Sequence, residues 1–183
     1  MKDYKNAGGQ LKRAVVDASS AIILFKAGLF LQLMRTYQVL MTESVHSEVT
    51  LEGYPGAEFF REVRHCLALT IVSCNRSVAQ PFTNDPRLDL LDLGERDAIA
   101  CLICRQADFI ITDDGRGSSF CRDNNLPFIN ALLFPKLLFL NGRFSTAVYE
   151  EKTAKIMQYG RYSQRIIESA GAMGLKELKP FLP

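Results

Sequence analysis

Residues 109–117 have the sequence FIITDDGRG, in which an apolar run ends abruptly on two adjacent carboxylates, Asp113 and Asp114. A short apolar run bounded by a polar turn predicts a buried β-strand. Aspartate and glycine both favour turns, so the chain is expected to leave the strand near Gly115. The stretch therefore predicts a strand with two negative charges at its carboxyl end.

The rest of the chain repeats this pattern in both directions. Apolar strand-like runs alternate with amphipathic helices, without internal repeats or low-complexity segments, and this alternation is typical of an α/β fold. Strands are expected at 13–16, 37–42, 66–75, 108–114 and 126–130. Helices are expected at 21–37 with a weak point at Gly28, 43–53, near 56–65, 91–107, 118–125 and 131–142 with an interruption at Pro135.

Local signals add detail to this outline. Ser19 or Ser20 is expected to cap the first helix, and Thr42 the second. The polar, proline-bearing segment 76–89 is the connection expected to be flexible. The tail from Arg143 is expected to be helical.

Composition limits the classes of function. The chain has 183 residues, 48% of them hydrophobic, which suits one globular domain with a short extension. Its formal net charge of +2 does not indicate a general nucleic-acid binder, so any electrostatic function must be local. No apolar run reaches the ~18 residues of a membrane span, and the five cysteines lie mostly in apolar runs. We therefore expect a cytoplasmic protein with reduced thiols and no membrane partner.

Several acids follow the predicted strands or lie in the first turns of the predicted helices. In open parallel sheets, functional groups gather at the carboxyl ends of strands, so folding is expected to bring these acids together. Each acid also has a purely structural interpretation as a helix cap, a solvated charge, a partner of the helix dipole or a turn residue. The acids are Asp17, Glu48, Asp97, Asp113 and Asp114.

Clustered carboxylates repel one another, by about 4 kcal/mol for two charges ~4 Å apart at an effective dielectric near 20. A cation would remove this conflict. Oxygen ligands without histidine or cysteine suit Mg²⁺ or Mn²⁺, which commonly engage phosphate oxygens. The cluster thus predicts a metal-dependent site for a phosphate ester.

Glu95 competes with Asp97 for a place in this cluster. Helix geometry separates the two side chains by about 200° around the axis, so both cannot easily point inward. The Asp92–Glu95 spacing fits a capping box, which gives Glu95 a structural role. Asp97 shares a face with Cys101 and Cys104, whose C-x-x-C pairing we interpret as core packing. These considerations favour Asp97 as the inward acid.

The ordered residues resemble the PIN-domain family of metal-dependent ribonucleases, which includes toxins of the VapC type. The likeness is carried by VVDASSAIILFKAGLFLQLMRTYQVLMTESVHSEV and LGERDAIACLICRQADFIITDD. It implies a three-layer α/β/α sandwich whose parallel sheet has the strand order 3-2-1-4-5, in a PIN-like domain of residues 1–142. Residues 143–183 would form a helical extension packed on or beside it.

The resemblance also implies the roles of individual residues. Asp17, Glu48, Asp97 and Asp114 match the four acidic positions; Asp17, Asp97 and Asp114 would hold one or two Mg²⁺ or Mn²⁺ ions, with Asp113 and Glu95 as further candidates. Ser19 and Thr112 would orient these carboxylates. Arg116 and Arg122 are candidates for contacts with RNA phosphates. The implied activity is hydrolysis of RNA phosphodiester bonds.

The resemblance leaves the biological setting open. Many relatives are toxins of toxin–antitoxin pairs and often dimerise, so an antitoxin protein and a second copy of the chain are candidate partners beside RNA. The alternative is a catalytically silent PIN-like domain that binds protein or RNA. In that case the acids serve only as caps and turns.

Overall fold

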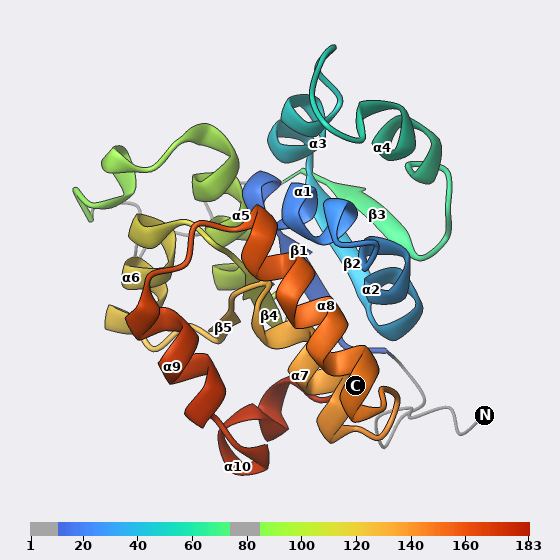
Figure 1. The fold of residues 1–183 in the computed structure, drawn as a ribbon. Helices are drawn as coiled ribbons and strands as arrows, with labels where there is room; N and C mark the ends of the chain where they lie inside the picture. Colours follow the sequence, from blue (N-terminus) through green and yellow to red (C-terminus); the bar gives the residue numbers. More distant parts are fainter. Residues whose placement is uncertain (1–10, 74–84) are drawn as a thin grey trace.

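The computed structural model describes residues 11–73 and 85–183, and at its centre lies a five-stranded parallel sheet (Figure 1). The strand order is β3-β2-β1-β4-β5, as predicted. In the register, Val15 of the central strand pairs with Leu40 on one side and Ile110 on the other. The strands are β1 (Arg13–Val16), β2 (Gln38–Thr42), β3 (Leu69–Val72), β4 (Phe109–Ile111) and β5 (Phe128–Ile129).

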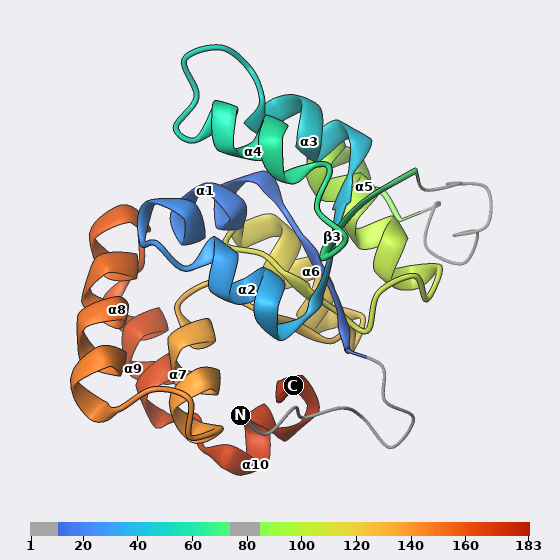
Figure 2. The ribbon, with the colours of Figure 1, turned by 90° about the vertical axis from the view of Figure 1, so that its right-hand side faces the viewer.

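Helices cover both faces of the sheet because successive strand residues point to opposite sides. Ala14 and Val16 belong to one hydrophobic core cluster, whereas Val15 belongs to another. Figure 2 shows the resulting layers, which confirm the three-layer sandwich. The first face packs against α1 (Ala18–Lys26), α2 (Phe30–Thr36), α7 (Leu133–Leu140) and α8 (Thr146–Tyr159), and the second against α5 (Leu93–Ile103) and α6 (Gly115–Asp123).

The helix expected at 21–37 is two helices. Gly28 has a φ of 68°, a conformation that favours glycine, and α1 and α2 are bent by 110° about this break. The first helix starts earlier than predicted, because the cap is Asp17 instead of Ser19 or Ser20. Thr42 caps α3 (Glu43–Val49), as predicted.

Two further boundaries differ from the sequence-based prediction. Pro135 does not interrupt α7; it lies in the first turn, where a backbone N–H has no partner within the helix. The helix expected at 118–125 already begins at Gly115, because Asp114 caps it. The short helix α4 (Ala57–Val63) precedes β3, the strand at one edge of the sheet, and packs Phe60 into the first core cluster.

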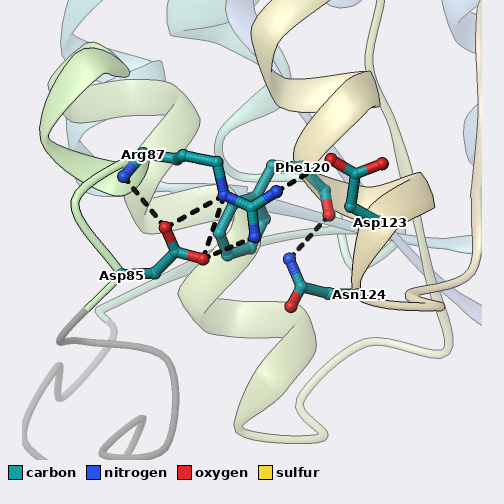
Figure 3. Close-up of polar contacts among 5 residues, drawn as sticks. All are labelled: Asp85, Arg87, Phe120, Asp123 and Asn124. Carbon is teal, nitrogen blue, oxygen red and sulfur yellow. Dashed lines mark hydrogen bonds and ion pairs between the residues drawn. The ribbon is translucent and has the colours of Figure 1, made fainter.

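The described chain resumes at Asp85, and this end of the connection is tied to α6. Most of the segment expected to be flexible, and the end of the predicted third strand, lie in 74–84, outside the described residues. Arg87 donates to Asp85 (2.6 Å) and to Asp123 (2.8 Å), and its guanidinium lies over the ring of Phe120 (Figure 3). The short helix η2 (Leu88–Leu90) follows and leads into α5.

The tail after Gly142 is helical, as predicted, and packs on the first face of the sheet. Ile156 of α8 is fully buried in the same core cluster as Val16. The Nζ of Lys136 donates to the carbonyls of Ala170 (2.8 Å) and Gly171 (2.7 Å) at the end of α9. The tail comprises α8, α9 (Gln164–Ala172), α10 (Leu175–Leu178) and η3 (Lys179–Phe181).

Within 11–73 and 85–183, no single helix is long and apolar enough to cross a membrane. The sharply bent pair of α1 and α2 meets the length and composition criteria only when the two helices are taken together.

Candidate functional site

Asp17 lies at the carboxyl end of β1 and is only 2% exposed. Its Oδ1 accepts hydrogen bonds from the backbone N–H of Ser20 (2.7 Å) and the hydroxyl of Ser19 (3.0 Å). Its Oδ2 is buried and has no hydrogen-bond partner within residues 11–73 and 85–183. Burial raises the pKa of Asp17, and the hydrogen bonds from the Ser20 backbone N–H and the Ser19 hydroxyl oppose that rise. One carboxylate oxygen therefore caps α1, while the other remains available.

The doublet after β4 divides into two different roles. Asp114 caps α6, because its Oδ1 accepts from the backbone N–H groups of Arg116 and Gly117, both at 2.7 Å. Asp113 accepts from the backbone N–H of Ala131 (3.1 Å) and from the hydroxyl of Tyr162 (2.5 Å). Burial, followed by the negative charge of Asp17, raises the pKa of Asp113 to about 6. The C-terminal extension, through Tyr162, is thus part of the site.

Three acids from α3 and the start of α5 complete the cluster. Asp17, Glu48, Asp92 and Glu95 line one small cavity of about 50 Å³. Burial raises the pKa of Glu48, and the charges of Asp92 and Asp17 raise it further. Burial, then Asp114 and Asp92, raise the pKa of Glu95 to about 7. The raised pKa values of the two glutamates therefore reflect their burial first and the neighbouring carboxylates second.

The expectation that Asp97 instead of Glu95 points inward does not match this geometry. Asp97 accepts a hydrogen bond from the hydroxyl of Ser44 (2.7 Å), which links α5 to α3. The predicted capping box between Asp92 and Glu95 is present, with bonds of 2.8 and 3.2 Å. It holds Glu95 at the mouth of the cavity instead of turning it away. Gly94 is the sequence signal for the close approach of α5 to α3. A Cβ at this position would lie 3.5 Å from Glu48 Oε2 and 3.2 Å from a Val45 methyl.

The two hydroxyls expected to orient the carboxylates lie beside Asp17. Ser19 donates to it directly, and Thr112 is 2% exposed. A Cβ on Gly117 would lie 3.3 Å from the Thr112 hydroxyl, so this glycine lets the start of α6 approach the end of β4 closely. The backbone at the start of α6 therefore packs closely against Thr112 after the end of β4.

The acidic cluster opens into a larger cleft of about 560 Å³. Asp113, Asp114 and Glu95 line one part of it; the last residue of α8, Tyr159, and two residues before α9, Arg161 and Tyr162, line another. Arg122 lines this cleft as well. Arg116, the other predicted RNA contact, instead donates to the carbonyl of Leu90 (2.9 Å).

A family model described as a PIN domain matches residues 13–134 of the chain. The chain belongs to the PIN-domain family. The PIN-domain match covers all five strands and the acids of the cluster, and it ends inside α7, so Tyr162 and Arg161 lie beyond it. The sequence matches no curated protein and no solved structure. PIN domains are generally nucleases and typically use divalent metals, so the fold is nuclease-like.

The donor set of this PIN domain fits a hard divalent cation. Among the residues that the structure describes, no three His, Cys, Asp or Glu side chains are already arranged around a common metal position. Mg²⁺ does not need such a cage, since it usually takes one or two carboxylates and keeps several waters. The buried Oδ2 of Asp17, which lacks a partner, and the neighbouring carboxylates of Glu95 and Asp114 supply the required chemistry.

Proposed function

We propose that this PIN-domain protein is a metal-dependent endoribonuclease that hydrolyses RNA phosphodiester bonds. The buried, unpartnered Oδ2 of Asp17 beside the carboxylates of Glu95 and Asp114 carries the proposal. A buried carboxylate oxygen without a hydrogen-bond donor is costly, and carboxylates gathered beside it add repulsion. A cation that bridges them to a phosphate would offset both costs.

Asp17 and Asp114 would hold the ion, because each uses Oδ1 to cap a helix and has a second oxygen for the metal. Mg²⁺ or Mn²⁺ at this edge would make a bound water more acidic and offset charge on the attacked phosphate. Ser19, which donates to Asp17, and the neighbouring Thr112 would hold the carboxylate in orientation. Tyr162 holds Asp113 against Ala131, at the cleft wall.

Glu48 and Glu95 would complete the negative field around the ion. Glu95 would take the place predicted for Asp97, because it lines the cavity with Asp17. Asp97 would instead have a supporting role through its bond to Ser44. Replacement of Glu95 by glutamine and, separately, of Asp97 by asparagine therefore tests which of the two acids belongs to the site.

The test is cleavage of an end-labelled panel of RNAs by the purified full chain. Wild type, Asp17→Asn, Glu95→Gln, Asp97→Asn and the exposed control Glu150→Gln are each assayed with Mn²⁺ and with a chelator. We expect metal-dependent cleavage by wild type and by Glu150→Gln, a loss of at least 100-fold in Asp17→Asn, and a larger loss in Glu95→Gln than in Asp97→Asn.

Two results would contradict the proposal. Cleavage that persists in Asp17→Asn would place the activity elsewhere or in a contaminant. Absence of cleavage by folded wild type on every RNA would favour the alternative, a catalytically silent interaction domain. Association with an antitoxin, formation of a homodimer and a cytoplasmic location stay predictions.

A further inference from the structure

A second cleft continues from the acidic one along the C-terminal extension. It has a volume of about 650 Å³ and lies between the α6–β5 region and α9. The two clefts share four lining residues, so together they form one trough that leads away from the acid cluster. The shared residues are Arg122, Phe128, Asn130 and Ile166.

Three arginines line this trough. Arg122 lies in both clefts, Arg161 in the first and Arg165 in the second. All three are exposed, and none forms an ion pair with a carboxylate in the described part of the chain. The acid that lines the second cleft, Glu177, uses Oε2 to accept from the backbone N–H of Gly174 (3.0 Å). The trough is therefore positively charged beyond its acidic end.

Apolar and aromatic surfaces alternate with these charges. The ring of Phe128 lies 6.0 Å from the guanidinium of Arg122. Ile166 and Tyr159 are each 40% exposed on the same wall. Asn130, common to both clefts, has a buried side-chain oxygen that no donor of the described residues contacts. Basic groups beside flat rings suit single-stranded nucleic acid, whose phosphates and unstacked bases need both kinds of contact.

We propose that this trough binds a single strand of RNA on one side of the bond that is cleaved at the acid cluster. Arg122, Arg161 and Arg165 contact successive phosphates, and Phe128 supports a base. The assignment rests on the proposed ribonuclease function. Two of the three arginines belong to the extension, outside the PIN-domain match, so the extension supplies the substrate-binding wall.

The test measures binding separately from cleavage. Asp17→Asn protein in chelator is titrated with a fluorescein-labelled oligouridylate at several salt concentrations, with anisotropy as the readout. The double substitution Arg161→Ala/Arg165→Ala is compared with Lys176→Ala, a control on the same extension whose exposed side chain lines neither cleft. The salt dependence is the slope of log K against log salt concentration. We expect the magnitude of this slope to decrease by about 0.7 for each arginine removed and to stay unchanged in the control.

The same pair of arginine substitutions is then made in the otherwise wild-type chain with Mn²⁺. We expect KM to rise at least fivefold with little change in kcat, since contacts remote from the cleaved bond are lost equally from the ground and transition states. Metal-dependent cleavage with unaltered KM and an unaltered salt slope would overturn the RNA-binding role of the trough and leave the proposed nuclease activity in place. Binding that depends on the arginines without any cleavage would instead overturn the nuclease and retain the trough.

A different occupant would also be recognised. Poly-glutamate that competes with the oligouridylate at equal charge, and depends equally on Arg161 and Arg165, would overturn the RNA assignment in favour of an acidic protein segment. Preference for double-stranded over single-stranded RNA would overturn the role of Phe128, because paired bases cannot stack on a side chain.

Discussion

Replacement of Asp113 by asparagine should stabilise the protein above pH 6 in the absence of metal. Asp113 sits against the extension, where Oδ1 accepts from both the Tyr162 hydroxyl (2.5 Å) and the Ala131 N–H (3.3 Å). An asparagine with its oxygen in place of Oδ1 keeps these two bonds, loses the 3.1 Å bond that Oδ2 accepts from Ala131, and removes the charge. The substitution therefore changes the electrostatics of the site with little change in its packing.

The size of the effect follows from the pKa. Burial and the neighbouring Asp17 raise the pKa of Asp113 from 3.8 to about 6, and this difference corresponds to about 3 kcal/mol. Between these two pH values the folded state binds more protons than the unfolded state, so wild-type stability falls as the pH rises. The stabilising contribution of the protonated carboxyl is complete below pH 3.8 and is lost above about pH 6. Asp113→Asn should lack this loss.

Urea unfolding followed by circular dichroism, in chelator and at pH values from about 4 to 8, measures the difference. Asp113→Asn should exceed wild type by up to about 3 kcal/mol at the upper end of this range, and the two should converge at the lower end. Glu150→Gln, at an exposed position of α8, should follow wild type throughout. Lower stability of Asp113→Asn at every pH would refute the reasoning, because the carboxylate would then be a net stabilising group in its charged form.

Three other perturbations probe the same arrangement. Tyr162→Phe removes a 2.5 Å hydrogen bond to the carboxylate of Asp113 and should lower the free energy of unfolding by about 2 kcal/mol at pH 8, as measured by urea unfolding. In a double-mutant cycle, the same substitution should cost less in the Asp113→Asn background. Ile156→Ala empties a fully buried position of α8 and should cost about 2–5 kcal/mol in a single unfolding transition; a separate early transition of the extension would contradict joint folding. Addition of Mn²⁺ should raise the melting temperature of wild type more than that of Asp17→Asn, and equal shifts would indicate a metal position without Asp17.

The parallel sheet could be predicted from sequence because its strands are short apolar runs between helices. β1 and β4 are buried on both faces; Asp17 directly follows β1, and Asp113 lies two residues after β4. Parallel strands bring their carboxyl ends to one edge, so the proximity of Asp17 to the doublet at 113–114 follows from topology alone. The break at Gly28 was also detectable, since a glycine inside an apolar helical run marks a position where the chain can turn.

The choice between Glu95 and Asp97 required tertiary information. Helix geometry correctly placed the two side chains on different faces, but it does not say which face meets the sheet edge. That is decided by how α5 docks on α3, where Ser44 takes Asp97 as its acceptor. A capping box does not exclude Glu95 from the cavity, because the same side chain accepts from the Asp92 backbone N–H and lines the cavity with Asp17.

The contact between Asp113 and Tyr162 could not be anticipated by any local rule. The two residues are 49 positions apart, and Tyr162 follows α8 in a segment with no strand or acid nearby in sequence. A periodicity argument sees only neighbours within a few turns. The sequence therefore predicts a helical extension packed on or beside the domain, and the structure adds that its residues line one wall of the cleft.

Under the proposed function, capping and metal binding are compatible roles for these acids, and Asp114 allows the two to be separated. Its Oδ1 accepts two backbone N–H groups at the start of α6. Asparagine is as good a cap as aspartate, whereas alanine at such a position costs about 1 kcal/mol. We therefore expect Asp114→Asn to unfold at nearly the urea concentration of wild type and Asp114→Ala at a lower one, while both lose metal-dependent cleavage to a similar extent. Retained cleavage in Asp114→Asn would mean that the cap is its whole function.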